Sequence, residues 1–557
     1  MKQITGVKKY FFLLRGLLNV DILKLPIGFV WFMFRQMRHE KLTRLNGKTI
    51  VSTNFSPLPS RSYDTAIKRF VQMSKGELIP FSAYFAVTDR CPFDCWYCSN
   101  AGKEEKKDLS TNEAKEIIGK LQDAGLSCIG FSGGEPLVRE DIVELIKAVD
   151  DRSYSILFTT GYGMTQEKGF ELKNAGLHAL VVSLDSHIKE DQNKSKNNSG
   201  AFETAVNAVK YSVKAGIYTA LNMVISKEML LSDEKNEYLK FAGELGVNEV
   251  RILEPSPCGK LFLKEFERFS EGDRNIIRGF QYRINKDPAS PKIMAYAHAT
   301  SDGIFGCGAG IYHMHVTAKG EVTPCDLVQV AAGNLLKESF PEIMRRMREF
   351  IPRPSEYCIS HGVAEKAKDM VLESLPLKDH EKNKVLLNSL DYGRMPLMYA
   401  KLVKGNVSKT GSEMKIKNVG HFLVVLFVCA CTGLNGAYFG QAGGVAGSIT
   451  GAVTGVIAGF LFLRGYYHNK KITEKNYGKA LKLGAIYGAI SGFLVHVPAL
   501  FFNFKGIYNI LGILIFLLAP IVGLLSGAFL GIILGRLLSK VRMEAEDEAV
   551  PVLPEEK

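Results

Sequence analysis

The sequence predicts an α/β fold built on a parallel sheet, followed by an all-α membrane domain. The first observation is that short apolar runs alternate with amphipathic segments from about residue 81 to residue 254, as in successive strand–helix units. The second is the series of long apolar stretches in residues 419–540. A chain of 557 residues has room for two or three domains of this kind.

Six strands are expected in the α/β region, and amphipathic helices separate them. The clearest helix begins with a capping box at Ser110 and Glu113 and continues with apolar residues at helical spacing. Strand–helix–strand units join through right-handed crossovers, so the carboxyl ends of the strands share one edge, where ligands bind. The expected strands are residues 81–88, 128–132, 155–161, 179–185, 219–226 and 249–254.

Three cysteines follow the first expected strand. Cys91, Cys95 and Cys98 have the spacing Cys-x3-Cys-x2-Cys. Three thiolates on one loop can hold three irons of a 4Fe–4S cluster and leave the fourth iron open to another ligand. A structural zinc site is the alternative, but it needs four closed ligands, and no second pair with Cys-x2-Cys spacing exists.

This loop resembles that of the radical S-adenosylmethionine (radical SAM) enzymes, with Tyr97 at the aromatic position before the third cysteine. The resemblance implies a partial (β/α)6 barrel of the TIM type. It also implies that the open iron binds SAM. One electron, from a cytosolic reductant of the ferredoxin or flavodoxin type, then cleaves SAM to methionine and a 5′-deoxyadenosyl radical that abstracts hydrogen from a substrate.

The residues expected to bind SAM lie at the ends of the predicted strands. Gly133, Gly134 and Glu135 resemble the family's Gly-Gly-Glu-Pro turn; glycines allow close approach of the backbone, and Glu135 can accept a hydrogen bond from the SAM ammonium. The alternative for each strand-end polar residue is an ordinary cap or turn. The remaining expected SAM contacts are Tyr97, Thr160, Ser183, Asp185 and Asn222.

A second cysteine set predicts an auxiliary cluster. Twelve residues separate Cys307 from Gly320, and four separate Gly320 from Cys325, with an expected hairpin over 313–323. This spacing resembles the SPASM or twitch extension of the same family, and the number of cysteines favours the twitch type with one cluster. Cys307, Cys325 and Cys358 are the expected ligands. The fourth position is left open between Cys258, His361, the substrate and no ligand. Cys128 is expected in the core.

Four transmembrane helices are predicted between residues 419 and 540. No Asp, Glu, Lys or Arg occurs from His421 to Leu463, and two further apolar stretches follow residue 482. Glycines at every fourth residue from Gly443 to Gly459 favour close helix packing. Lysines and arginines precede the first span, lie between the second and third, and follow the fourth, which predicts a multi-pass cell-membrane protein with a cytoplasmic catalytic domain.

The N-terminal arm has two interpretations. Residues 10–34 are rich in large apolar side chains but include Arg15, Asp21 and Lys24, which disfavour a spanning helix. The arm is expected either to lie at the membrane interface or to pack on the barrel. The net charge of +13 is assigned to anionic lipid rather than to nucleic acid.

The predicted organisation and function are as follows. A membrane-bound radical SAM enzyme is expected, acting on a lipid or lipid-linked molecule; a tethered peptide or protein maturase and a non-catalytic iron–sulfur redox protein are the alternatives. The domains are an interfacial arm (1–80), a radical SAM core (81–300), a twitch-like cluster region (301–362), a basic linker (363–418), the four spans (419–540) and an acidic tail (541–557).

Overall fold

The protein is described by a computed structural model that covers residues 2–407, apart from 7, 14–15, 17–18, 78, 102–106 and 370–374. The expected spans (419–540) and the acidic tail (541–557) lie outside the described residues. Within the described part, no helix has both the length and the apolar character needed to cross a membrane.

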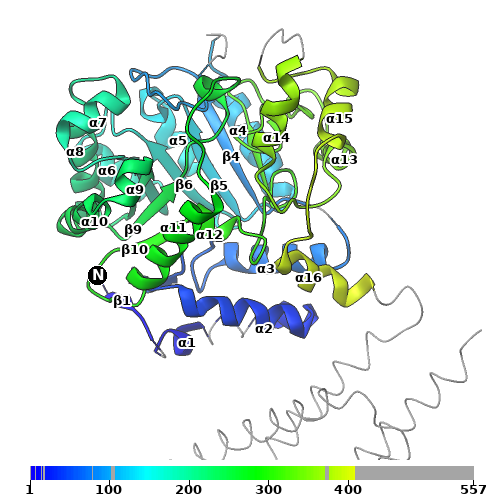
Figure 1. Cartoon of the computed structure of the whole chain (residues 1–557), viewed down its shortest axis with the longest axis horizontal. Coiled ribbons are helices and arrows are strands. Elements are labelled where there is room, and N and C mark those ends of the chain that lie inside the picture. The colour runs from blue at the N-terminus through cyan, green and yellow to red at the C-terminus, as the bar shows by residue number, and fades with distance from the viewer. Residues whose placement is uncertain are drawn as a thin grey trace, which may run out of the picture. The chain divides into compact units, whose positions relative to one another are not determined.

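A mostly parallel sheet of ten strands lies at the centre of the unit formed by Met1–Thr410 (Figure 1). The strand order is β10-β9-β8-β7-β6-β5-β4-β11-β12-β13, so the sheet is open, with β10 and β13 at its edges. The six expected strands are confirmed as β4 to β9, and β10 adds a seventh that the sequence pattern did not indicate. The strands are β4 (Ser82–Thr88), β5 (Cys128–Gly133), β6 (Tyr154–Thr159), β7 (Ala179–Ser183), β8 (Tyr218–Val224), β9 (Glu249–Leu253), β10 (Lys292–Ala295), β11 (His313–Val316), β12 (Glu321–Thr323) and β13 (Gly333–Asn334).

Helices cover the outer face of the sheet. The capping box of α4 (Thr111–Asp123) is confirmed, because the Ser110 hydroxyl accepts from the Glu113 amide while the Glu113 carboxylate accepts from the Ser110 amide. Ile117 and Leu121 of this helix are buried in one apolar cluster with Phe131 of the sheet. The other helices that connect the parallel strands are α5 (Ile142–Lys147), α6 (Gln166–Asn174), α7 (Lys189–Lys196), α8 (Ala201–Lys214), α9 (Lys227–Leu231), α10 (Glu234–Glu244) and α11 (Glu271–Ile284).

The N-terminal segment closes the amino ends of the parallel strands. Glu249, the first residue of β9, accepts hydrogen bonds from the Thr53 amide and hydroxyl and from the Tyr218 hydroxyl. The Tyr154 hydroxyl, at the start of β6, donates to the Thr53 carbonyl over 3.1 Å. Ile50 completes a small apolar cluster on the inner face of the sheet. The N-terminal segment thus covers the amino ends of β6 and β9, and ligands of parallel sheets bind at the opposite, carboxyl ends of the strands.

The arm over residues 1–80 folds onto this unit rather than standing apart. It forms a three-stranded antiparallel sheet and several short helices, and the expected helix over 10–34 is divided. Phe29 and Phe32 of α2 are buried, whereas Ile27 and Trp31 are exposed. The packing interpretation therefore holds for one face of α2. The elements are β1 (Lys2–Ile4), α1 (Lys8–Leu13), α2 (Ile27–Gln36), β2 (Leu42–Leu45), β3 (Lys48–Ile50) and α3 (Arg61–Ser74).

The segment after β10 contains the predicted hairpin and several helices. β11 pairs with β12 through His315–Thr323 and Val316–Val322, and Gly320 turns between them at φ 81°, as expected. The described part of the expected linker over 363–418 forms helices, whose Leu387, Met398 and Leu402 are buried. Its charged residues masked this apolar stripe in the sequence. The helices are α12 (Tyr296–Ala299), α13 (Phe340–Phe350), α14 (Ile359–Lys366), α15 (His380–Asn388) and α16 (Leu397–Val407), the last beside α2 (Figure 1).

Candidate functional site

The three cysteines of the first motif lie on one loop that leaves the carboxyl end of β4. Burial raises the pKa of Cys91 to about 12, and the charges of Glu135 and of the Cys95 and Cys98 thiols contribute in the same direction. The three sulfurs are thus close enough to interact, and they release protons when they bind iron. Three converging thiols fit a 4Fe–4S cluster with one iron that has no protein ligand.

Neighbouring elements hold this loop in place. The Asp94 amide donates to the Lys196 carbonyl over 3.1 Å, at the end of α7. The Lys260 amide donates to the Cys98 carbonyl over 2.9 Å, and the Gln329 carboxamide donates to the Ser99 carbonyl over 2.7 Å. The loop therefore depends on segments from three distant parts of the chain.

Tyr97 and Asp185 are joined to each other and to a buried lysine. The Tyr97 hydroxyl donates to both carboxylate oxygens of Asp185, over 3.0 and 2.8 Å. Asp185 also accepts from the Ser195 hydroxyl and the Val224 amide and pairs with Lys196 Nζ at 2.7 Å. Protein donors thus occupy both oxygens of Asp185, which was expected to contact SAM. Asp185 positions the cluster loop through Tyr97.

Lys196 is a site residue that the sequence did not reveal. Its side chain is 1% exposed and contacts the Tyr97 hydroxyl as well as Asp185. It belongs to the very polar helix α7, in which nothing distinguishes one lysine from another. Only the fold shows that this lysine is the one turned inward.

The Gly-Gly turn brings β5 against the start of the cluster loop. A Cβ on Gly133, whose φ is +124°, would lie 2.2 Å from the Thr88 carbonyl oxygen. A Cβ on Gly134 would lie 2.2 Å from the Arg90 carbonyl oxygen. The two glycines are thus required by the close approach of the protein's own backbone.

The Glu135 carboxylate has four hydrogen-bond donors within the protein. Its side chain is fully buried, and its carboxylate accepts from the Leu137 amide, the Thr159 hydroxyl, and both the amide and the hydroxyl of Thr160, over 2.5 to 2.9 Å. These bonds fill the acceptor positions of a carboxylate. The side chains of Glu135 and Thr160 therefore fix the end of β6 to the Gly-Gly turn, and a direct bond from the Glu135 side chain to the SAM ammonium is not favoured.

We expect Gly134→Ala to reduce cluster loading, because the Arg90 carbonyl that its Cβ would meet is backbone and cannot rotate away. Overpacking of this kind costs about 1–3 kcal/mol. Iron per chain after anaerobic reconstitution, together with the unfolding midpoint, measures the effect. Gly119→Ala in α4 is the matched control, since a Cβ there meets no atom within 4 Å. Equal iron content in the two variants would contradict the close-approach argument.

Ser183 and Asn222 are direct partners on the neighbouring strands β7 and β8. Both are partly buried, and the Asn222 carboxamide oxygen is buried without a hydrogen-bond partner. Buried polar atoms are normally satisfied. Of the expected SAM contacts at the strand ends, Asn222 thus has the side chain most available to a ligand.

The cysteines of the second motif converge as expected. Cys307 and Cys358 are hydrogen-bonded to each other. The charge of Cys358 acts to raise the pKa of the Cys325 thiol, and the charge of Cys325 acts in the same direction on the pKa of Cys307. The Cys307 amide donates to the Ser355 carbonyl over 2.8 Å, which brings the segment before Cys358 alongside. Three thiols from two segments fit the ligand set of one auxiliary cluster.

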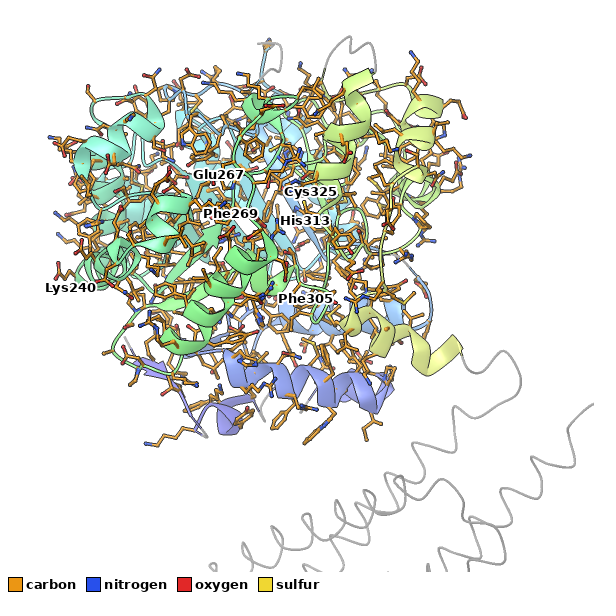
Figure 2. The ribbon with its side chains drawn as sticks, viewed as in Figure 1. Lys240, Glu267, Phe269, Phe305, His313 and Cys325 are labelled. Carbon is orange, nitrogen blue, oxygen red and sulfur yellow. The ribbon has the colours of Figure 1, made fainter. Side chains whose placement is uncertain are left out.

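Two further side chains lie at this second set. Potential ligand atoms of His313, Cys325 and Asp326 lie within 4.8 Å of one another, and Figure 2 shows His313 beside Cys325. His313 Nδ1 is 3.0 Å from the Ser82 hydroxyl, whereas its buried Nε2 has no partner. His313 and Asp326 therefore join the candidates for the fourth ligand position, which the sequence had left open between Cys258, His361, the substrate and no ligand. A histidine at the start of an expected strand was the signal available.

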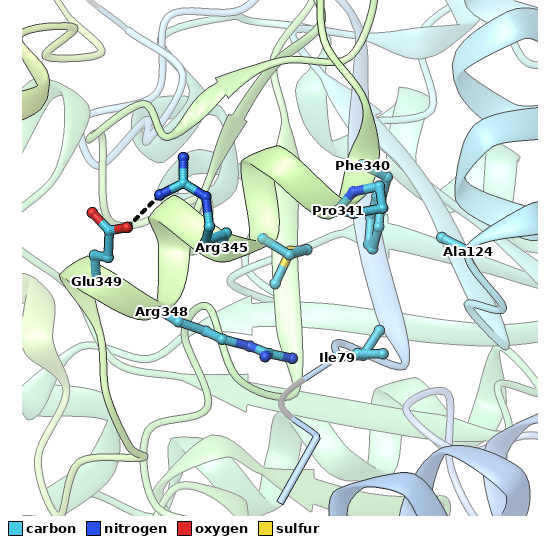
Figure 3. A pocket seen from close by; sticks show the side chains of 8 residues that line it. Ile79, Ala124, Phe340, Pro341, Arg345, Arg348 and Glu349 are labelled. Atoms are coloured by element: carbon cyan, nitrogen blue, oxygen red, sulfur yellow. Dashed lines mark hydrogen bonds and ion pairs between the residues drawn. The ribbon is translucent and has the colours of Figure 1, made fainter.

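A surface pocket of about 560 Å³ lies elsewhere, between α13 and the residues Ile79 and Ala124 (Figure 3). Arg345 and Glu349 form an ion pair at its side, with an N–O distance of 2.6 Å. None of the expected site residues lines this pocket. We do not assign it to the reaction.

Comparisons with known proteins identify two domains. The model of the radical SAM superfamily matches residues 85–236, and that of the SPASM iron–sulfur cluster-binding domain matches residues 307–360. These domains indicate a 4Fe–4S cluster, an auxiliary cluster and SAM binding. The SPASM match contains the three cysteines assigned to the auxiliary cluster.

Several characterised relatives share about half of the chain. An AdoMet-dependent heme synthase of Methanosarcina barkeri is 27% identical over 310 residues, 51% of this chain and 87% of the relative. A PqqA peptide cyclase of Bradyrhizobium diazoefficiens is 25% identical over 270 residues, 46% of this chain and 69% of the relative. The solved structure of Streptococcus suis SuiB bound to precursor peptide SuiA has 16% identity and a TM-score of 0.42, covering 51% of this chain and 69% of SuiB. The chain thus carries a radical SAM domain, of a superfamily whose members are enzymes, joined to a SPASM domain.

Proposed function

We propose that the protein cleaves SAM reductively and uses the resulting radical to abstract hydrogen from a substrate held on the inner face of the sheet. The observation that carries this proposal is the convergence of the Cys91, Cys95 and Cys98 thiols at the carboxyl end of β4, beside the Gly-Gly turn. The amino ends of the strands are closed by the N-terminal segment, so cofactor and substrate share the opposite edge.

The residues of the chain hold and orient the reacting groups. The cluster with SAM bound supplies one-electron cleavage of the sulfonium to methionine and a 5′-deoxyadenosyl radical. Cys91, Cys95 and Cys98 would hold three irons, and Asn222 would offer the cofactor a buried amide oxygen that has no hydrogen-bond partner. Asp185, Lys196 and Tyr97 fix the loop, so that the open iron keeps one position relative to the strand ends.

Membrane attachment through residues 419–540 is part of the proposal. It is supported by the apolar stretches and the distribution of lysine and arginine in the sequence. The catalytic unit would face the cytoplasm, where a ferredoxin- or flavodoxin-type protein can supply the electron. Fractionation of cells that express the full chain tests this: recovery in membranes after an alkaline wash is expected, and recovery in the soluble fraction would contradict it.

A lipid or lipid-linked molecule is the first candidate substrate, because the proposed spans would place the catalytic unit at a bilayer. A peptide is the second candidate, supported by the similarity to a PqqA peptide cyclase. The similarity to a heme synthase is comparable, so the relatives do not favour one class.

We expect the reconstituted and reduced protein to convert SAM to 5′-deoxyadenosine, measured by liquid chromatography and mass spectrometry under anaerobic conditions. No product from protein that carries its iron would refute the enzyme proposal and favour a redox protein. Comparing lipid extracts and peptide masses of cells that express the wild type or Cys95→Ala then separates the substrate classes. A change confined to lipids supports the first candidate, and a change confined to peptides the second.

A further inference from the structure

Arg251 is a buried cation on the inner face of the sheet. It lies in the middle of β9, and its side chain is 1% exposed. Its Nη2 donates to the Tyr296 hydroxyl over 2.5 Å and approaches the Tyr84 hydroxyl at 3.5 Å. Its Nε and Nη1 are buried and have no hydrogen-bond partner. An arginine cannot lose its charge in a protein, so a full positive charge is held there with three of its five N–H donors unused.

The other buried cations of the described residues have carboxylate or backbone carbonyl partners. Lys196 pairs with Asp185, Lys292 with Glu40, and Arg139 with Asp141. Lysines 9 and 41 and Arg69 donate to backbone carbonyls. Arg251 alone among them has only tyrosine hydroxyls as acceptors. The carboxylate nearest along its strand, Glu249, is already bonded to Thr53 and Tyr218.

The side chains around Arg251 leave its Nε and Nη1 without a hydrogen-bond acceptor. Phe158 and Tyr296 lie against the guanidinium, with ring centroids 4.9 and 5.5 Å away. Asn222 is its direct partner on β8 and also has an unpartnered buried oxygen. Asn222 is partly exposed, so solvent reaches the inner face of the sheet at this level. Unused guanidinium donors and an unpartnered amide oxygen therefore occur together beside the edge at which the cluster loop lies.

We propose that Arg251 binds an anionic group of the substrate, a carboxylate or a phosphate, on the inner face of the sheet. This inference rests on the proposed function and adds to it the chemical class of the substrate. Aromatic rings on the faces of a guanidinium and free N–H groups on its edge suit a planar carboxylate or a phosphate oxygen. The SAM carboxylate has the same chemistry and is the other source of such an anion.

Removing the charge of Arg251 should therefore affect the stability of the ligand-free protein and its anion binding differently. An unpaired buried charge destabilises the ligand-free fold, and replacing such a charge with an apolar side chain is often neutral or stabilising. Arg251→Met is therefore expected to unfold at the same temperature as the wild type or higher when no anion is present. A purely structural arginine would give the opposite result, because its removal would lower the unfolding temperature.

The test uses the full chain with inorganic phosphate and acetate as probes. Unfolding temperature is recorded against the concentration of each anion, with chloride holding the ionic strength constant. We expect a saturable rise for the wild type and an affinity at least about 30-fold weaker for Arg251→Met. Arg61→Met is the matched control, because Arg61 is exposed and pairs with Asp151 at the surface. It should retain the wild-type response.

Further measurements distinguish the possible results. SAM affinity is measured for the wild type and Arg251→Met; a comparable loss of SAM binding would assign the anion to SAM and overturn the substrate proposal. Absence of a saturable response in the wild type, an equal response in Arg251→Met, or a strong fall in its anion-free unfolding temperature would overturn it as well. Formation of 5′-deoxyadenosine by the same wild-type preparation shows whether the proposed function itself stands.

Discussion

Cys95→Ala is expected to abolish formation of 5′-deoxyadenosine from SAM and to lower iron from about eight to about four per chain, since each 4Fe–4S cluster contributes four irons. Cys95 is the central thiol of the loop, and its removal leaves two ligands for the first cluster. The auxiliary set, Cys307, Cys325 and Cys358, is untouched by the change. Iron and sulfide analysis with electron paramagnetic resonance measures both results.

The control for this prediction is Cys128→Ala. Cys128 is 2% exposed on the inner face of the sheet, in the small apolar cluster with Tyr154 and Ile156, as the sequence predicted. This variant should keep its iron and form product. If Cys95→Ala lost all of its iron, a separate auxiliary cluster would be refuted; if it kept all of its iron, the first cluster would have other ligands.

Lys196→Met is expected to destabilise the protein by about 3–5 kcal/mol, because it leaves the buried carboxylate of Asp185 without its cation. The bonds from Tyr97, Ser195 and the Val224 amide remain, which places the expected value near the lower end. The loop that carries the cysteines is also expected to loosen, with a loss of iron. Anaerobic urea unfolding and iron content measure the two effects.

Lys189→Met on the same helix is the matched control. Lys189 pairs with Glu203, and both side chains are about half exposed. Exposed pairs of this kind contribute roughly 0–1 kcal/mol. In the double variant Asp185→Asn with Lys196→Met, part of the lost stability should return, since no charge is left unpaired. A Lys196→Met variant as stable as Lys189→Met would show that the buried pair does not hold the loop.

Local patterns predicted the elements whose character is set by their own residues. The strands β4 to β9 follow from apolar periodicity. The capping box of α4 follows from a side chain that hydrogen-bonds the backbone amide three residues later. β10 and the helices α15 and α16 did not follow. β10 is four residues long and begins with Lys292, a buried lysine whose partners are Glu40 and the Lys41 and Val51 carbonyls, all from the N-terminal arm.

The site also combines features that local sequence patterns predicted and features that they did not. The cysteine spacing predicted both ligand sets, since thiols that hold one cluster must stand close together along the chain or flank a turn. The hydrogen bonds of Glu135 were not predicted, because three of its four donors belong to Thr159 and Thr160, at the end of a strand that begins 19 residues later in the chain. Arg251 had a visible signal, a charge inside an otherwise apolar strand, but its lack of a partner is a property of the folded protein.

The sequence by itself therefore determined the class of fold and predicted the iron ligands and the turn beside them, because apolar periodicity, cysteine spacing and glycine turns are patterns visible along the chain. The tertiary structure decided which charged side chains are buried, which of them are paired, and which are left for a ligand. Burial and pairing depend on segments brought together from distant parts of the chain, as Lys196 with Asp185 and Tyr97, or the unpaired Arg251, make clear. No local pattern carries that information.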